Sequence, residues 1–311
     1  MADVHTPDPG TDDNPYAGLL VNDAHWAFGT DFEDPLAGVD TTVPEDVDPG
    51  VLAAYCLMLG DDALVLSQRL SEWCSRAPDL EEDIALANIA LDLLGQARLL
   101  LARAAAADPT VVPSLPAGSP VPDEDRLAFF RDDLHFRNVR LAEVGGGDFA
   151  DVVVRILLFA SWRLALLEGL AGSRDGVLAA VAAKGTKELT YHRDFAARWF
   201  LTLARGTEES RRRLVAALEQ RWPLWEELFV THPVELDAAT SGIGVDPAAV
   251  AEDVDGVLDR VFGASGVARP DVAPLAGVRG RTGRDGCHTE ALGLLLAEMQ
   301  VVARAHPEGR W

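Results

Sequence analysis

Positive charge is scarce in this sequence. Of its 311 residues, 27 are Lys or Arg and 50 are Asp or Glu, which gives a formal net charge of -23 at pH 7. Sequence-independent contact with nucleic acid phosphates or with an anionic membrane surface requires clustered positive charge. The charge balance therefore excludes both, and we expect neither nucleic acid nor a membrane as a partner.

Cysteine and long apolar runs are scarce as well. The three cysteines, Cys56, Cys74 and Cys287, form no CxxC pair, and the N-terminal residues show no signal-peptide pattern, so we expect no disulfide framework and a cytoplasmic location. A transmembrane helix needs about 18 or more apolar residues in succession. The richest candidate, residues 152–170, is interrupted by charged side chains, so no membrane span is expected.

The first 50 residues contain no Lys or Arg but twelve Asp and Glu, with repeated Pro and Gly. This composition is typical of a solvated, weakly structured extension. A binding arm anchored by Trp26 and Phe28 is the alternative interpretation. We therefore divide the chain into an acidic extension at residues 1–50 and a folded domain at residues 51–311.

No segment of the folded domain shows the period-two alternation of a β-sheet, and apolar residues instead recur at helical spacing. The predicted long helices cover residues 51–77, 80–107, 123–144, 149–170, 175–204 and 208–229, with shorter ones near 250–262 and 289–305. The predicted fold is all-α: a ferritin-like helical bundle with additional C-terminal helices. Because apolar residues surround nearly the whole of helix 80–107, we expect it to be the central helix.

The best-known chemistry of such bundles is a di-metal site built from two Glu residues and two Glu-x-x-His pairs. The spacing matters because residues three apart share one helix face. None of the seven histidines has a Glu three positions before it. Asp132-x-x-His135 lies in a charged segment typical of a solvated face, and Glu188 precedes His192 by four, with Leu189 at the ligand position. We therefore predict no metal ligands in this chain.

A polar stripe interrupts the apolar helix 80–107, because Asn88, Asp92 and Gln96 recur every four residues. Buried polar groups need partners. We expect a cation to meet them, with Arg69, Arg155 and Lys187 as the candidates. The stripe is consistent with a ligand pocket or with a satisfied polar network in the core.

Several segments resemble the PaaC family, the structural subunits of phenylacetyl-CoA epoxidase (ring 1,2-monooxygenase) complexes. The resemblance is carried by Leu59-Gly60-Asp61, Leu86-Ala87-Asn88-Ile89, Leu91-Asp92-Leu93-Leu94-Gly95-Gln96-Ala97-Arg98, Lys187-Glu188 with Tyr191-His192, and Leu296-Ala297-Glu298-Met299-Gln300. It implies a non-catalytic subunit that pairs with a PaaA-type catalytic subunit holding di-iron. It also implies a small PaaB-type subunit and a reductase with flavin and an iron-sulfur centre, acting on phenylacetyl-CoA.

The resemblance also implies where a metal site has degenerated. Set against the PaaA-type pattern, the first Glu-x-x-His pair falls on Leu93 and Gln96, and the second on Leu189 and His192. The two remaining ligand positions fall on Ala63 and Ala160. We expect a polar network to fill the space of the metal, and its predicted members are Asp62, Asn88, Asp92, Gln96, Lys187, Glu188 and His192.

Two other functions stay open at this point. One is a di-metal oxidase in its own right, with ligands drawn from Asp62, Asp92, Glu168, Glu188 and His192. The other is a stand-alone helical interaction protein, and a homodimer of the isolated chain is a further alternative. For a subunit of a complex, we expect the interface among exposed apolar residues of the long helices and the C-terminal segment, because permanent interfaces are large and apolar.

Overall fold

The computed structural model describes Leu36 and residues 38–309. Residues 39–311 form one compact unit. The acidic extension predicted for residues 1–50 lies mostly outside the described residues. Among the residues that are described there is no β-strand, only an isolated bridge between Val278 and Arg281. The all-α prediction is confirmed.

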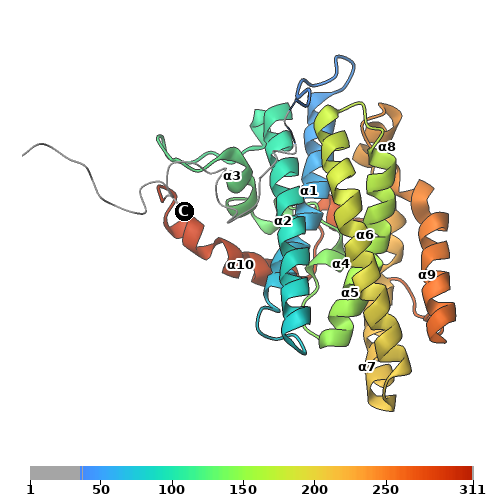
Figure 1. The fold of residues 1–311 in the computed structure, drawn as a ribbon. Helices are drawn as coiled ribbons and strands as arrows, with labels where there is room; N and C mark the ends of the chain where they lie inside the picture. Colours follow the sequence, from blue (N-terminus) through green and yellow to red (C-terminus); the bar gives the residue numbers. More distant parts are fainter. Residues whose placement is uncertain (1–35, 37, 310–311) are drawn as a thin grey trace, which may run out of the picture. The chain divides into compact units, whose positions relative to one another are not determined.

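Four long helices form the ferritin-like bundle: α1 (Pro49–Ser71), α2 (Leu80–Ala107), α5 (Phe149–Leu170) and α6 (Gly176–Arg205). The most extensive packing is between α1 and α2 and between α5 and α6, and α2 also lies beside α6 (Figure 1). Each of the four helices begins after an aspartate whose carboxylate accepts backbone N–H groups of the first turn; these N-caps are Asp48, Asp79, Asp148 and Asp175. Such caps fix where the helices start.

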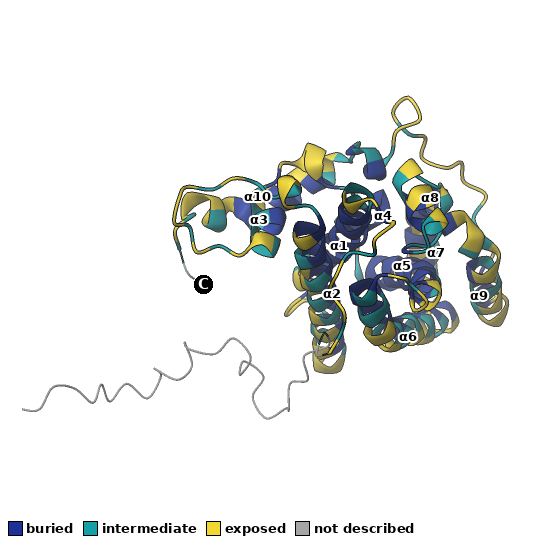
Figure 2. Cartoon of the chain, turned by 90° about the horizontal axis from the view of Figure 1, so that it is seen from above, coloured by how far each residue is buried: buried dark blue, intermediate teal, exposed yellow. Residues whose placement is uncertain are grey.

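The central helix of the bundle is α5, not α2. Eighteen of the 22 residues of α5 are buried, whereas only 13 of the 28 residues of α2 are. Figure 2 shows α5 largely dark blue, while α2 carries exposed and intermediate residues along its length. Apolar side chains of α2 that the sequence places in the core lie in solvent: Leu80 is 68% exposed, Ile84 53%, Leu91 63% and Leu94 45%. The prediction that helix 80–107 is the central helix was therefore wrong.

Residues 123–144 do not form the single predicted helix. They divide into α3 (Asp123–Phe129), a 3-10 turn η4 (Asp133–His135) and α4 (Arg140–Glu143). The cause is a pair of buried carboxylates on α1. Asp61 accepts the backbone N–H of Arg137 at 2.9 Å and Asp62 accepts that of Val139 at 2.8 Å. These tertiary hydrogen bonds replace the helical ones that the local sequence favours.

The helix predicted for residues 208–229 also ends early. It comprises α7 (Glu208–Arg221) followed by two 3-10 turns, η5 (Trp222–Leu224) and η6 (Glu226–Phe229). Pro223 cannot donate the hydrogen bond that a continuing helix needs. A short helix that the sequence did not predict, α8 (Pro233–Thr240), follows.

The additional C-terminal helices are confirmed. They are α9 (Ala251–Ser265), preceded by the 3-10 turn η7 (Pro247–Val250), and α10 (Glu290–Ala305) after η8 (Gly283–Asp285). A further short turn, η3 (Pro109–Val111), follows α2. Figure 1 shows α10 with α3 on one side of the bundle and α9 on the other.

Two helices, α1 and α2, are long and apolar enough to cross a membrane by length and composition alone. In the bundle, 83% of the apolar window of α1 is buried against other helices, compared with 50% of the window of α2. A core helix of a folded domain passes the same test, so this is weak evidence for a membrane. The three cysteines are free, as predicted.

Candidate functional site

The six positions at which the resemblance places a degenerate metal site all lie buried on the four long helices. Leu93, Leu189, Ala63 and Ala160 are each at most 1% exposed, and Gln96 and His192 are 3% and 1% exposed. The four positions where the resemblance implies a carboxylate are therefore occupied by buried apolar side chains. The chemistry of the site depends on the polar groups beside them.

The main polar group in this interior is Arg163, which is fully buried on α5 one helical turn after Ala160. Its Nε donates to Gln96 Oε1 on α2 at 3.1 Å, and its Nη1 lies 4.0 Å from Asp62 Oδ2 on α1. One guanidinium from α5 thus lies within reach of polar groups on two neighbouring helices.

Gln96 extends this contact to the fourth helix, since its Nε2 donates to Glu188 Oε2 on α6 at 2.9 Å. Glu188 in turn pairs with the exposed Lys184 at 3.3 Å. The close approach depends on Gly185, where a Cβ atom would lie 3.2 Å from Gln96 Nε2. Asp62, Arg163, Gln96 and Glu188 thus connect all four helices, and we refer to them as the cross-bundle chain.

Other predicted members of the network lie elsewhere. His192 and Asp92 form a separate pair, with Nε2 and Oδ2 3.0 Å apart. Asn88 and Lys187 are exposed, outside the cross-bundle chain. Glu168 is exposed as well, so the alternative ligand set of a di-metal oxidase is not assembled.

The cation that meets the polar stripe is Arg163, and the predicted candidates do not fill this role. Arg69 donates from Nε to the carbonyl oxygen of Glu143 at 2.7 Å, and Arg155 donates to the carbonyl oxygen of Val144. Both side chains therefore lie at the end of the bundle where α5 begins. The sequence contained one signal for Arg163, which is its position in the middle of the apolar run 152–170. A charge there requires a buried partner.

The residues present do not fit a di-iron centre. Iron of this type needs several carboxylate and imidazole ligands together, and four of the six positions offer none. A buried guanidinium lies beside them and would repel two metal cations. Among the described residues, the one group of acidic side chains close enough to hold an ion is Asp79, Glu81 and Glu82, which lies at the start of α2.

The Arg163 guanidinium is incompletely hydrogen-bonded. Its Nη1 and Nη2 are buried and have no hydrogen-bond partner among the described residues. Burial lowers the pKa of Arg163 to about 10, and the nearby Asp62 charge only partly opposes this effect. The side chain still carries its charge at neutral pH. A buried cation with two free nitrogens costs free energy, so it is poorly explained as a stabilising contact.

A second buried polar region adjoins the cross-bundle chain through Asp62. Its acids are Asp61, Glu143, Glu227 and Glu235, and its cations are Arg131, Arg140, Arg284 and His288; we refer to these eight residues as the anchor cluster. Arg284 Nη2 lies 3.0 Å from Asp62 Oδ2, and Arg284 Nε lies 3.2 Å from Glu235 Oε1. The anchor cluster ties residues 131–143 and 283–289 to α1.

Within the anchor cluster, His288 is held as an imidazolium. Its Nδ1 lies 2.7 Å from Glu143 Oε2 and its Nε2 lies 3.0 Å from the carbonyl oxygen of Phe136. Both partners are acceptors, so both ring nitrogens must donate. Burial acts to lower the pKa of His288, but the hydrogen bond with Glu143 and its charge outweigh burial and the net shift is upward.

Comparison with known proteins shows the family of the chain. Residues 38–311 match the family described as phenylacetic acid catabolic protein. The chain belongs to this phenylacetic acid catabolic protein family. A curated member, the C subunit of 1,2-phenylacetyl-CoA epoxidase from Escherichia coli (strain K12), is 42% identical to it over 260 residues. That alignment covers 84% of this chain and 99% of the Escherichia coli protein.

The family assignment agrees with the resemblance seen in the sequence. The matched region also gives an N-terminal boundary for the folded domain. The matched region of this phenylacetic acid catabolic protein begins at residue 38, close to Val39, where the compact unit begins. Residues 39–48 therefore belong with the bundle. Arg103 of α2 donates to the carbonyl oxygens of Thr41 and Thr42 at 2.6 and 3.2 Å, which holds this segment in place.

Proposed function

We propose that this chain is a non-catalytic subunit of a multicomponent phenylacetyl-CoA 1,2-epoxidase. In this proposal it pairs with a di-iron PaaA-type catalytic subunit in the cytoplasm and stabilises it during aerobic phenylacetate degradation. A small PaaB-type subunit and a reductase carrying flavin and an iron-sulfur centre complete the complex. The Escherichia coli relative is named as a subunit of 1,2-phenylacetyl-CoA epoxidase, which supports the assignment of the reaction.

One observation carries the non-catalytic part of the proposal. The apolar side chains of Ala63, Leu93, Ala160 and Leu189 occupy the four carboxylate positions, and the buried guanidinium of Arg163 lies beside them. The cross-bundle chain then occupies space that a metal centre would need. Because four of the six ligand positions are apolar, the contribution of this chain in the proposal is an interface and a shape.

The pairing part of the proposal is supported by the outer face of α2. Leu80, Ile84, Leu91 and Leu94 are separated by four, seven and three residues, so they lie on one side of the helix. All four are 45% exposed or more. Helix α10 adds Leu294, Val301 and Val302, which are 64%, 58% and 54% exposed. An apolar helix face left open in one chain is typical of a surface that another subunit covers.

The test is co-expression of this chain with a PaaA-type subunit from the same organism, followed by size measurement and iron counting. We expect one stable complex, with about two irons for each PaaA-type chain, as di-iron carboxylate bundles hold. This chain purified alone is expected to hold no iron above background. Two irons in the isolated chain, with turnover of phenylacetyl-CoA when a reductase is supplied, would contradict the proposal and favour a di-metal oxidase.

A further inference from the structure

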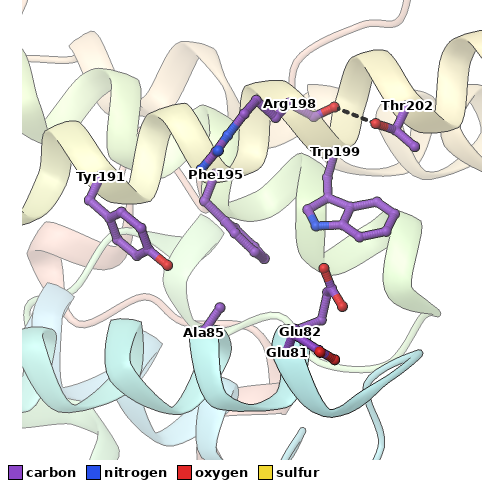
Figure 3. A pocket seen from close by; sticks show the side chains of 8 residues that line it. All are labelled: Glu81, Glu82, Ala85, Tyr191, Phe195, Arg198, Trp199 and Thr202. Atoms are coloured by element: carbon purple, nitrogen blue, oxygen red, sulfur yellow. Dashed lines mark hydrogen bonds between the residues drawn. The ribbon is translucent and has the colours of Figure 1, made fainter.

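A small cleft opens between the start of α2 and the second half of α6. Its volume is about 270 Å³, and its lining includes Glu81, Glu82, Tyr191, Phe195 and Trp199 (Figure 3). Pockets for drug-sized ligands measure about 300 to 1,000 Å³. The cleft is therefore better matched to a single side chain than to a metabolite such as a coenzyme A thioester.

One wall of the cleft is aromatic. Tyr191, Phe195 and Trp199 are spaced by four along α6, so their rings line up on one face of the helix and point toward α2 (Figure 3). The Trp199 indole packs edge-to-face against the Phe149 ring, with ring centroids 5.0 Å apart. This packing restrains the indole, which is the ring that binds cations best.

The opposite wall is acidic. Asp79, Glu81 and Glu82 offer carboxylate oxygens that all lie within 4.8 Å of one another. In Figure 3 the carboxylate of Glu82 lies directly below the Trp199 indole. Its Oε2 atom is buried. The pKa of Glu82 is raised, because its carboxyl group hydrogen-bonds to the Asp79 carboxyl and is partly desolvated, while a hydrogen bond from the Trp199 side chain acts in the opposite direction. A guest cation would relieve this crowding of negative charge.

The cleft's own cation does not fill it. Arg198 lines the rim, and its Nε donates back to the carbonyl oxygen of Asp194 on the same helix at 3.3 Å. Thr202 likewise donates to the carbonyl oxygen of Arg198 at 2.9 Å. These polar groups bond to the backbone of α6, and among the described residues Arg198 forms no ion pair with Glu81 or Glu82.

We infer that this cleft receives an arginine side chain of the PaaA-type partner, stacked on the aromatic wall and paired with Glu81 and Glu82. Arginine fits better than lysine, since its planar guanidinium can stack on a ring and donate to carboxylates at the same time. A protein guest is favoured over a free small cation because the exposed apolar face of α2, with Leu80 and Ile84, begins at the same end of the helix. An anchored charge next to apolar surface is typical of interface hot spots.

The inference rests on the proposed pairing and makes it specific to one site. The test measures binding of the isolated full-length chain to the PaaA-type subunit by biolayer interferometry, using Glu82→Gln and Trp199→Ala. Each variant is expected to raise Kd by about tenfold or more, as the loss of a hot-spot residue does. Trp199→Phe keeps an aromatic wall and is expected to recover most of the affinity. The thermal midpoint of each variant, measured in parallel, shows that it is folded.

The matched control is Glu252→Gln, which removes an exposed acidic side chain from the first turn of a different helix, α9. It should leave Kd unchanged. Glu82→Gln should also weaken the dependence of Kd on salt concentration, because a charge pair is lost. An alanine scan of surface arginines on the PaaA-type subunit should find one whose effect disappears in the Glu82→Gln background.

The outcomes separate the two proposals. If the wild-type chain does not bind the PaaA-type subunit, the proposed pairing and the arginine site both fail. If it binds and folded Glu82→Gln and Trp199→Ala variants bind equally well, only the arginine site is wrong. A loss of self-association, with binding to the PaaA-type subunit intact, would assign the cleft to a second copy of this chain and also overturn the inference.

Discussion

The two buried polar regions of the bundle are linked through Asp62, but the arginine that each places beside Asp62 is partnered differently. In the anchor cluster, Arg284 donates to both Asp62 oxygens and to the carbonyl oxygens of Met58 and Arg137, and it pairs with Glu235. In the cross-bundle chain, Arg163 makes one hydrogen bond within the described part of the chain, through Nε to Gln96. Both guanidinium groups are buried, so the difference lies in their partners.

Their pKa values shift in opposite directions for this reason. Burial acts to lower both, but the charges of Asp62 and Glu235 reverse the effect at Arg284, whose pKa is raised, while the pKa of Arg163 falls to about 10. The anchor cluster therefore stabilises the irregular segments that it holds. The cross-bundle chain buries a guanidinium that is incompletely paired, which costs free energy.

The largest effect is expected from Arg284→Met. The variant leaves the carboxylates of Asp62 and Glu235 buried without their cation, and breaking a buried pair costs about 3 to 5 kcal/mol. Urea unfolding followed by circular dichroism measures the change in the free energy of unfolding. The control is Arg174→Met, which removes an exposed arginine that pairs with Asp46 and should cost far less. Equal losses in the two variants would contradict the distinction between the anchor cluster and ordinary surface pairs.

A smaller loss is expected from Gly185→Ala, which tests the close approach of α6 to Gln96. The new methyl group would lie 2.6 Å from Leu167 Cδ1 and 3.2 Å from Gln96 Nε2. Overpacking of this kind costs about 1 to 3 kcal/mol. The matched control is Gly95→Ala on α2, where nothing lies within 4 Å of the added atom. That variant should be stabilised by about 0.5 to 1 kcal/mol, because alanine favours a helix over glycine.

The sequence predicted the helices that depend on local pattern and missed those that depend on distant partners. Residues 80–107 and 149–170 matched α2 and α5 because capping aspartates and apolar periodicity act within the segment itself. Residues 123–144 failed because Asp61 and Asp62, on another helix, take the backbone N–H groups. A pattern of apolar spacing holds no information about such contacts.

The candidate site was predictable to a similar degree. The spacing before His192 identified Leu189 as a position without a ligand, and the resemblance to the PaaA-type pattern added Leu93; both side chains are buried and apolar. It placed Asn88 and Lys187 in the network, although both are exposed, because a polar stripe on a helix does not reveal which side faces the core. Arg163 and Arg284 were missed as partners of the network, since their contacts join residues more than 60 positions apart.

A pH-dependent loss of stability is expected from His288. Its pKa is raised above the ordinary value of 6.5 in the folded state, so its contribution is fully present below about pH 6.5 and is lost as the pH rises through the folded value. The neutral ring cannot donate to both Glu143 and the Phe136 carbonyl. A charge-assisted hydrogen bond of this kind contributes about 1.5 to 3 kcal/mol. Unfolding titrations across this pH range measure the slope, and His288→Asn should flatten it. A slope unchanged in the variant would assign it to other groups.

The smallest effect is expected from Arg163→Met, although this side chain is as deeply buried as Arg284. Asp62 keeps its two hydrogen bonds to Arg284, and the only bond lost is the one to Gln96 Oε1. Replacing a poorly paired buried charge with an apolar side chain of similar length removes a desolvation cost, so the change should stay within about 1 kcal/mol and can be stabilising. Urea unfolding of Arg163→Met and Arg284→Met under the same conditions compares their losses of unfolding free energy directly. A loss as large as that of Arg284→Met would mean that the cross-bundle chain holds the four helices together.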